Sequence, residues 1–456
     1  MKFNDINDLY NKICGKKVAF IGIGVSHEEL IFKFAKAGAQ VTLCDKRNAD
    51  DIPEKDRLIE AGVTLKTGED YLENIDADMV LRTPGMYYNH PALIKMRQNG
   101  IFLTSEMELF FELCPCKIYA ITGSDGKTTT SNLIAEMLKK AGKTVHLGGN
   151  LGRALLPICD QIKKDDIAVV ELSSFQLISM KKSPQLAVVT NISQNHLDVH
   201  GTMEEYVGAK KNIFLYQDKN DRLILNADNE PCRKLQSEAK AKIDFFSYSK
   251  GEGKAFLDAE GYLCLNGERI MHKSLIRLPG EHNVENYLTA IAAVGDEVGF
   301  DVIRSVAENF GGVEHRIEFV REVNGARYYN DSIASSPTRS IAGLKAFDRK
   351  VILIAGGYDK NLSFEPLAPI IKERVKFLIT LGVTAEKIEK AVLGEASNLP
   401  APEIVRVNDM KEAVATAYKI ARDGDVVLLS PACASFDMYR NFELRGKHFK
   451  ELVNAL

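Results

Sequence analysis

The fold is decided by the stretch Thr122-Gly123-Ser124-Asp125-Gly126-Lys127-Thr128-Thr129-Thr130, which follows the apolar run 118–121 and opens a helical pattern that continues to Lys140. A strand, a glycine-rich turn and a helix start in this order are typical of a phosphate-binding loop, because glycines let backbone N–H groups close around phosphate oxygens. Lys127 would place its charge on the β- and γ-phosphates, and the Thr128 hydroxyl can bind Mg²⁺. The spacing GxxGKT is two residues shorter than the usual GxxxxGK[ST], but a plain glycine turn does not explain Lys-Thr at a helix start. We therefore predict nucleotide binding.

Strand-like runs alternate with helical patterns on both sides of this loop, which predicts an α/β fold with parallel sheets. Downstream strands are expected at 167–171, 186–191 and 223–226, and in the last third at 351–355, 377–380 and 426–429. The segment 245–270 is richer in turns and predicts a hairpin before a helix over 281–298. Gly311-Gly312 is a hinge signal.

The N-terminal segment reads as a βαβ unit with a glycine-rich turn. A strand at 17–21 is followed by Gly22-Ile-Gly24, a helix over 28–37 and a second strand that ends at Asp45. This order is typical of dinucleotide-binding folds, but His27 stands where the third glycine is required and should push the helix away from the strand. Three interpretations stay open: NAD binding, a nucleotide-binding βαβ unit without NAD, and a purely structural turn.

Length and composition limit the class of protein. At roughly 150 residues per domain, 456 residues favour three domains, which we place at 1–116, 117–312 and 313–456. The 45% apolar and 27% charged residues exclude wholesale disorder, and a net charge of -3 gives no electrostatic footprint for nucleic acid. No apolar run reaches about 18 residues and the N-terminus lacks a signal-peptide pattern, so we expect a cytoplasmic protein that contacts no membrane. The eight cysteines show no zinc spacing.

Two further side chains follow predicted strands. Glu171 closes the run Ala168-Val-Val-Glu171, and His196 follows the strand at 188–192. Taken alone, Glu171 could be a solvated strand-end charge and His196 a structural histidine. Beside a phosphate loop, a strand-end carboxylate is the expected Mg²⁺ partner.

Together these motifs resemble the Mur ligases of peptidoglycan synthesis, ATP-dependent enzymes that form amide bonds. The resemblance covers essentially the whole chain and rests on 121–129, 148–152, Glu171-Leu-Ser-Ser-Phe-Gln-Leu177, Asn195-His-Leu-Asp198, 314–318 and Asn330-Asp-Ser332. The ending Ser430-Pro-Ala-Cys-Ala-Ser435 through Gly446 resembles the branch of the family that adds D-glutamate. The resemblance implies a Rossmann-like N-terminal domain, a central P-loop mononucleotide-binding domain and a C-terminal Rossmann-like domain.

The resemblance also implies a reaction. ATP would phosphorylate the carboxylate of UDP-N-acetylmuramoyl-L-alanine, and the amino group of D-glutamate would displace phosphate from the acyl phosphate. Phosphorylation is chemically required, because a carboxylate is a poor electrophile and the phosphate supplies a leaving group. The three domains would then serve the UDP substrate, ATP with metal, and the amino acid with closure. We expect a monomer.

The family's functional positions carry over residue by residue. The catalytic set is Lys127, Glu171, His196 and Lys210, and the ATP set is Gly123, Ser124, Asp125, Gly126, Lys127, Thr128, Thr129, Asn283, Asn286, Arg316 and Asp331. Two Mg²⁺ ions are expected near Thr128, Glu171, His196 and Lys210, the last as a carbamylated lysine. The UDP substrate is expected at Val25, Ser26, Asp45, Lys46, Arg47, Thr83, Pro84, Gly85, Asn150 and His196, and D-glutamate at Ser335, Lys360, Ser435 and Phe442.

The sequence also departs from the family pattern. Asn195 replaces an acid and Ile333 replaces a lysine, with Arg339 as a candidate substitute for that lysine. Lys210 aligns with the family's carbamylated lysine, but the adjacent Lys211 leaves a small uncertainty of one position in that alignment. Three rival interpretations remain: a family ligase with another amino acid or folate as substrate, a nucleotide-switched binding protein, and an NAD dehydrogenase.

Overall fold

The computed structural model describes residues 1–24, 26–150, 152–194 and 196–456. The chain forms two compact units, one of residues 1–275 with 284–306 and one of residues 276–283 with 307–456. The boundaries of the three expected domains remain a prediction.

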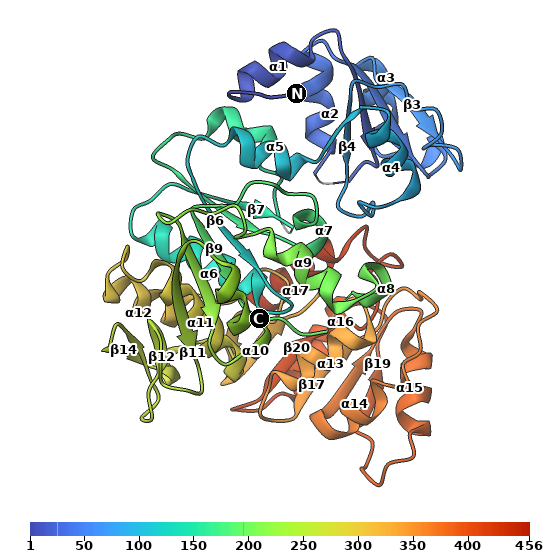
Figure 1. Ribbon diagram of the computed structural model, residues 1–456. Helices are drawn as coiled ribbons and strands as arrows, with labels where there is room; N and C mark the ends of the chain where they lie inside the picture. The colour runs from blue at the N-terminus through green and yellow to red at the C-terminus, as the bar shows by residue number, and fades with distance from the viewer. Residues whose placement is uncertain (25, 151, 195) are drawn as a thin grey trace. The chain divides into compact units, whose positions relative to one another are not determined.

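The first sheet is entirely parallel, in the order β3-β2-β1-β4-β5. Its strands are β1 (Lys17–Ile21), β2 (Gln40–Asp45), β3 (Thr64–Thr67), β4 (Met79–Arg82) and β5 (Phe102–Thr104). The accompanying helices are α1 (Ile6–Ile13), α2 (Glu28–Lys36), η1 (Ala49–Asp51), α3 (Lys55–Glu60), α4 (Pro91–Gln98) and α5 (Glu106–Leu113) (Figure 1). The expected βαβ unit is β1-α2-β2.

The second sheet has the order β14-β13-β12-β11-β10-β9-β6-β8-β7. Its strands are β6 (Lys117–Thr122), β7 (Val145–Gly149), β8 (Ile167–Glu171), β9 (Leu186–Val189), β10 (Arg222–Asn226), β11 (Lys242–Ser247), β12 (Ala255–Leu257), β13 (Tyr262–Leu265) and β14 (Glu268–His272). The pairs from β7 to β12 are parallel, whereas β12, β13 and β14 pair antiparallel, as the turn-rich segment predicted.

Helices follow most strands of this sheet. They are α6 (Lys127–Lys140), η2 (Leu156–Gln161), α7 (Ser174–Leu177), α8 (Leu197–His200), α9 (Met203–Lys211), α10 (Glu230–Lys234), η3 (Leu235–Glu238), η4 (Lys273–Leu275), α11 (Glu281–Val294) and α12 (Phe300–Asn309). The helix expected over 281–298 ends four residues early, at Val294, and residues 295–297 form a turn.

The third sheet lies in the second unit, in the order β15-β16-β20-β17-β18-β19. Its strands are β15 (Glu318–Val323), β16 (Ala326–Asn330), β17 (Val351–Ala355), β18 (Val375–Thr380), β19 (Glu403–Arg406) and β20 (Val426–Leu429). The helices are α13 (Pro337–Lys345), α14 (Ala368–Arg374), α15 (Ala385–Gly394), α16 (Met410–Ile420) and α17 (Phe442–Asn454). Only the β15–β16 pair is antiparallel among the described strands of this sheet.

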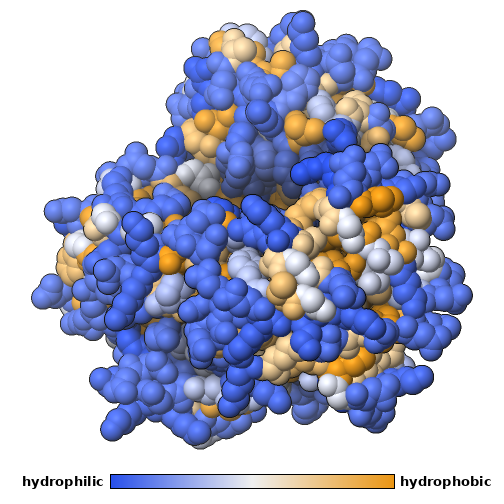
Figure 2. Space-filling model, turned by 90° about the horizontal axis from the view of Figure 1, so that it is seen from above, coloured by the Kyte–Doolittle hydropathy of each residue, from blue (hydrophilic) through white to orange (hydrophobic). Residues whose placement is uncertain are grey.

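The central strands read as continuous apolar runs because helices cover both faces of the sheets. The β8, β9, β17 and β20 side chains are buried along their whole length, as expected of parallel strands. The α/β fold class is confirmed. Among the described residues no helix is long and apolar enough to cross a membrane, and hydrophilic residues predominate on the face shown in Figure 2.

Candidate active site

The phosphate loop stands at the carboxyl edge of the second sheet. Strand β6 lies between β9 and β8, with Ile121 in register with Glu171 and Thr122 in register with Val189. Because the three strands are parallel, the loop that starts at Gly123, the carboxylate of Glu171 and the segment after Val189 emerge at one edge. The sequence alone placed each of these features at a strand end, and the strand order brings them together.

Two glycines let neighbouring side chains approach the loop backbone. A Cβ at Gly123, where φ is +153°, would lie 1.9 Å from Thr190 Oγ1, and a Cβ at Gly126, where φ is +77°, would lie 2.5 Å from Asn286 Oδ1. Thr190 Oγ1 in turn donates to the carbonyl oxygen of Asp125 at 2.6 Å. The loop is therefore held in shape by a threonine that sequence reasoning did not single out.

The side chain of Lys127 turns back toward the phosphate loop and binds two of its backbone carbonyls. Lys127 Nζ donates to the carbonyl oxygens of Gly123 at 3.0 Å and Ser124 at 2.8 Å. Thr128 is buried at the start of α6, and Thr129 is the third residue of that helix. Ser124 is tied through its hydroxyl to Tyr206 Oη at 2.9 Å.

Lys210 is the most unusual charged group of this edge. Only 2% of the residue is exposed, and its Nζ donates to the Gly123 carbonyl at 2.7 Å and to Thr122 Oγ1 at 3.2 Å. The amine also lies 4.8 Å from the centre of the Tyr206 ring. Burial, assisted by the charge of Lys127, lowers its pKa from 10.5 to about 7. Neutral amine is therefore well populated near pH 7, poised beside the phosphate loop.

Glu171 and His196 lie on segments that border this edge. Glu171 is 3% exposed and accepts a hydrogen bond from Asn150 Nδ2 at 2.9 Å, so the strand-end carboxylate is buried and does not face solvent. His196 is exposed with φ +54°, and its ring lies edge-on to Phe175 at 5.1 Å. The described residues contain no group of three His, Cys, Asp or Glu that could hold a metal.

The predicted UDP loops meet at the carboxyl edge of the first sheet. In β2-β1-β4, Ile21 is in register with both Cys44 and Arg82, so the turn after β1, the segment 45–47 and the segment 83–85 are adjacent. Between β1 and β4 the strand order reverses, and such a switch point is where open α/β sheets bind ligands. Lys46 and Gly85 are exposed and Thr83 and Pro84 half-buried. Val25 and Asn195 lie outside the described residues.

Asp45 closes this edge as a buried carboxylate paired with the exposed Arg47. Its carboxylate accepts from the Ile23 backbone N–H at 3.1 Å and from Arg47 Nε and Nη2 at 2.9 and 2.8 Å. Burial alone would raise the pKa of Asp45, but the Arg47 hydrogen bonds outweigh it and lower that pKa. The pair holds the turn that contains Ser26.

His27 fills the position of the third glycine without entering the helix. It is the N-cap residue of α2, it is buried, and its ring packs edge-on to Phe20 at 5.2 Å. Its Nδ1 donates a hydrogen bond to the Gly22 carbonyl oxygen at 2.8 Å. Burial lowers the pKa of His27 to about 4, so the imidazole is neutral.

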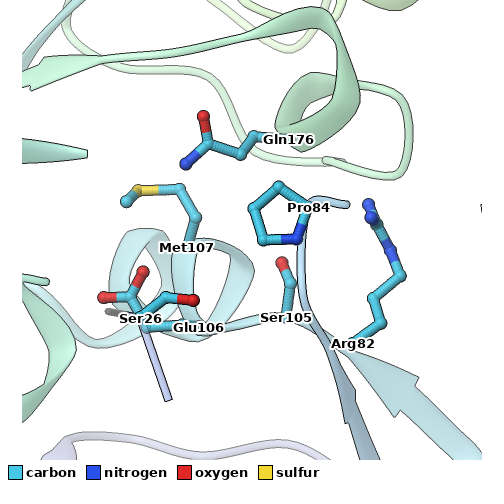
Figure 3. Close-up of a pocket in the computed structure, with 7 residues that line it drawn as sticks. All are labelled: Ser26, Arg82, Pro84, Ser105, Glu106, Met107 and Gln176. Atoms are coloured by element: carbon cyan, nitrogen blue, oxygen red, sulfur yellow. The ribbon is translucent and has the colours of Figure 1, made fainter. Parts of the chain in front are cut away.

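A small pocket in the first unit brings two predicted UDP residues together with unpredicted ones. It is lined by Ser26, Arg82, Pro84, Ser105, Glu106, Met107 and Gln176 (Figure 3). Gln176 approaches from α7 on the side opposite Ser105 and Glu106. The buried Arg82 donates to the Phe175 carbonyl at 3.1 Å and to Ser179 Oγ at 2.7 Å, so it ties the first sheet's edge to the segment after Glu171.

Most predicted residues of the second unit stand at the carboxyl edge of the third sheet, whereas Asn283 is buried in α11. Asp331 follows β16 and is buried, accepting from Ser430 Oγ at 2.8 Å. Burial raises its pKa to about 7. Arg316 and Lys360 are exposed, Ser335 is half-buried and Ser435 is buried. Arg339, the candidate substitute for the missing lysine, donates to the Ile333 carbonyl at 3.2 Å.

Arg445 joins the backbone segments that carry the predicted D-glutamate residues, and sequence reasoning missed it. It is 1% exposed, and its guanidinium donates to Ser332 Oγ and O at 3.0 and 2.8 Å, to Cys433 O at 3.1 Å and to Ala434 O at 3.1 Å. Ser332 Oγ donates onward to the Phe442 carbonyl at 2.8 Å. No pattern flags this residue, because an arginine in a helix usually faces solvent.

Comparisons with known proteins agree with this arrangement. The Mur ligase middle domain matches residues 121–294, and the Mur ligase glutamate ligase domain matches residues 315–433. The UDP-N-acetylmuramoylalanine--D-glutamate ligase of Acetivibrio thermocellus is 52% identical over 99% of both chains, and that of Clostridium kluyveri is 48% identical over the whole of both. Among solved structures, the UDP-N-acetylmuramate-alanine ligase of Thermotoga maritima matches with a TM-score of 0.59 and 19% identity, covering 96% of this chain and 99% of that one.

The chain belongs to the Mur ligase family. The relatives that bear the name of the D-glutamate-adding ligase match it from end to end at about half of all positions. The structural likeness to the Thermotoga maritima enzyme concerns the fold alone, given its low identity.

Proposed function

We propose that this chain is an ATP-dependent ligase that joins D-glutamate to UDP-N-acetylmuramoyl-L-alanine in peptidoglycan precursor synthesis. The observation that carries the proposal is the edge of the second sheet, where a phosphate loop, a buried carboxylate and the buried Lys210 of α9 lie together. The 52% identity to a named D-glutamate ligase over 99% of the chain supports the choice of substrates. The glycine turn of the first sheet then serves a uridine nucleotide and not NAD.

The first task of the site is to hold ATP with its γ-phosphate toward the acceptor carboxylate. Backbone N–H groups of 123–129 at the start of α6 would surround the phosphates, and Lys127 would leave its two loop carbonyls to meet their charge. Asn286, against Gly126, fixes the loop from the side of α11. Arg316 and Asp331 are proposed to reach the nucleotide when the domains close.

Lys210 is proposed to become a carbamate. A carbamate forms when a neutral amine attacks carbon dioxide, and burial keeps a large neutral fraction of this amine near pH 7. The product is a carboxylate on a long side chain. At the present position of the amine, this anion would face the Gly123 carbonyl oxygen and the face of the Tyr206 ring, which both favour a cation. It would therefore turn away from Gly123 and present an anion to the site.

The side chains present suit Mg²⁺. Hard cations prefer oxygen ligands, and Thr128, Glu171 and a carbamylated Lys210 would offer a hydroxyl and two carboxylates, with His196 nearby. Magnesium bound there would neutralise charge between the γ-phosphate and the acceptor carboxylate.

Positioning is proposed to complete the chemistry. Ser26, Asp45, Lys46, Arg47 and the segment 83–85 would hold the uridine nucleotide, with Asn150 at the muramoyl end. Ser335, Lys360, Ser435 and Phe442 would hold D-glutamate so that its amine meets the acyl phosphate. The carbonyl carbon gains the amine, passes through a tetrahedral intermediate and releases phosphate. Cytoplasmic location, a monomeric state and the boundaries of the three domains remain predictions from the sequence.

The experiment is amino-acid-dependent ADP release with matched UDP-muramoyl acceptors, comparing D-glutamate with L-alanine, L-lysine and meso-diaminopimelate. The proposal expects stimulation by D-glutamate only. Stimulation by another amino acid would favour a different ligase of the family, and slow phosphate release indifferent to every acceptor would favour a nucleotide-switched binding protein.

A further inference from the structure

The segment between the first and second sheets carries two thiols in contact. Cys114 is the C-cap of α5, where its backbone N–H donates to the Phe110 carbonyl at 2.8 Å, and Cys116 stands one residue before β6. The two sulfur atoms lie 3.5 Å apart. Both cysteines are reduced, and neither belongs to the nucleotide or amino-acid residues described above.

The two thiols differ in solvent exposure and in pKa. Cys116 is 6% exposed, whereas Cys114 is partly exposed. The hydrogen bond between the thiols lowers the pKa of Cys114, an effect that the nearby Lys182 ammonium assists and burial opposes. The same hydrogen bond and burial raise the pKa of Cys116. The outer thiol is thus the better nucleophile and the inner one stands next to it, which is the arrangement of an attacking and a resolving cysteine.

We propose that Cys114 and Cys116 form a reversible dithiol–disulfide site. In the reaction with a small disulfide compound, the Cys114 thiolate attacks one sulfur and releases the first thiol of the reagent. The Cys116 thiol then loses its proton, attacks Cys114 Sγ and releases the second thiol. The protein loses two electrons and two protons, and the reagent disulfide gains them as two thiols.

Closing this bond would disturb the active-site strand. The sulfurs must approach from 3.5 Å to about 2.05 Å, while α5 is held by Glu106, whose carboxylate accepts from the Leu155 and Leu156 N–H groups at 3.1 and 2.8 Å. The movement therefore falls on Cys116 and the start of β6. Strand β6 ends at Thr122, directly before the phosphate loop. Oxidation should therefore slow ADP formation, a consequence that rests on the proposed ligase activity.

The test uses full-length protein with Cys14→Ser, which removes the exposed thiol. After incubation with glutathione disulfide and alkylation, trypsin releases residues 98–117, which contain both cysteines and no others. The expected peptide has lost two hydrogen atoms, carries no alkyl group and regains two alkylation sites after dithiothreitol. Added Cys116→Ser should leave a stable glutathione adduct on Cys114, and added Cys114→Ser should leave Cys116 unmodified.

Other outcomes would overturn the site. Two alkyl groups on residues 98–117 after oxidation, a glutathione adduct that persists on the pair, or a cross-link from either cysteine to Cys159 would each contradict an internal disulfide. The peptide masses do not depend on activity, so they separate this proposal from the ligase assignment. ADP formation equal in the oxidised and reduced proteins would refute the coupling to the phosphate loop.

Discussion

Replacing Lys210 by methionine should abolish ligase activity and at the same time make the first unit more resistant to heat. Methionine has a similar length and no charge, so it fills the same buried space. The wild-type amine lies among backbone and aromatic atoms, with no carboxylate among its hydrogen-bond partners. The folded state must therefore give up a proton that the unfolded chain keeps.

The magnitude follows from the pKa. A tenfold change in proton affinity is worth about 1.4 kcal/mol, so a fall from 10.5 to about 7 destabilises the folded state by roughly 4 kcal/mol near pH 7. Methionine would lose the two hydrogen bonds of the Lys210 amine. The Gly123 carbonyl would still accept from Lys127 Nζ at 3.0 Å, and Thr122 Oγ1 would still donate to the Leu172 carbonyl at 2.8 Å. That loss should cost about 1 kcal/mol. The net gain is roughly 3 kcal/mol, or a rise in Tm of roughly 5 °C.

The pH dependence of the stability difference between wild type and Lys210→Met has a definite sign. Between the folded pKa of about 7 and the unfolded value, the unfolded wild-type chain binds more protons, so the contribution of Lys210 to stability improves as pH rises. The Tm advantage of Lys210→Met should therefore be greatest at pH 7 and below and shrink toward pH 10.

The assay is thermal unfolding in metal-free buffer stripped of carbon dioxide. Lys211→Met is the matched control, because Lys211 pairs at the surface with Glu238 and should bring no gain. Adding bicarbonate should raise the Tm of wild type and leave Lys210→Met unchanged. A variant that melts no higher than wild type near pH 7, or an advantage that does not change with pH, would refute the reasoning.

Three further predictions concern the two units. Gly123→Ala should raise the KM for ATP at least about tenfold, because the new Cβ would lie 1.9 Å from Thr190 Oγ1. A tenfold loss of affinity corresponds to only about 1.4 kcal/mol. An unchanged KM would contradict the close loop packing. Glu171→Gln keeps the shape that accepts from Asn150 but removes the charge, so kcat should fall by about a hundredfold or more and added Mg²⁺ should restore little, as steady-state kinetics can check. Arg445→Lys loses the fork that holds three carbonyls and should raise the KM for D-glutamate several-fold while the KM for ATP stays constant; equal changes in both would indicate general destabilisation.

Much of the fold could be predicted from the sequence, because parallel strands buried on both faces leave apolar runs and their loops leave glycines. The phosphate loop, Glu171 and Asp45 were found in the same way, as polar residues where such runs end. What a linear pattern cannot supply is the lateral order of strands: it is the placement of β6 between β9 and β8 that brings Thr190 against Gly123.

Long-range polar contacts explain the remaining misses. Arg445 reaches the backbone carbonyl of Ser332, more than a hundred residues away, and helical periodicity favours a solvent-facing arginine. Arg82 is similar, since its partner at Ser179 belongs to another sheet's segment. The state of Lys210 also depends on burial in three dimensions, although the resemblance to the family singled out its position.

The central claim is that a carbamylated Lys210 serves a D-glutamate ligase, and ADP release with UDP-N-acetylmuramoyl-L-alanine tests it most directly. Wild type, Lys210→Ala and Lys211→Ala are compared with and without D-glutamate, each with bicarbonate added or removed. The account predicts D-glutamate-dependent release in wild type and Lys211→Ala that weakens when carbon dioxide is removed, and none in Lys210→Ala. Full activity of Lys210→Ala, or ADP release that does not respond to D-glutamate, would contradict it.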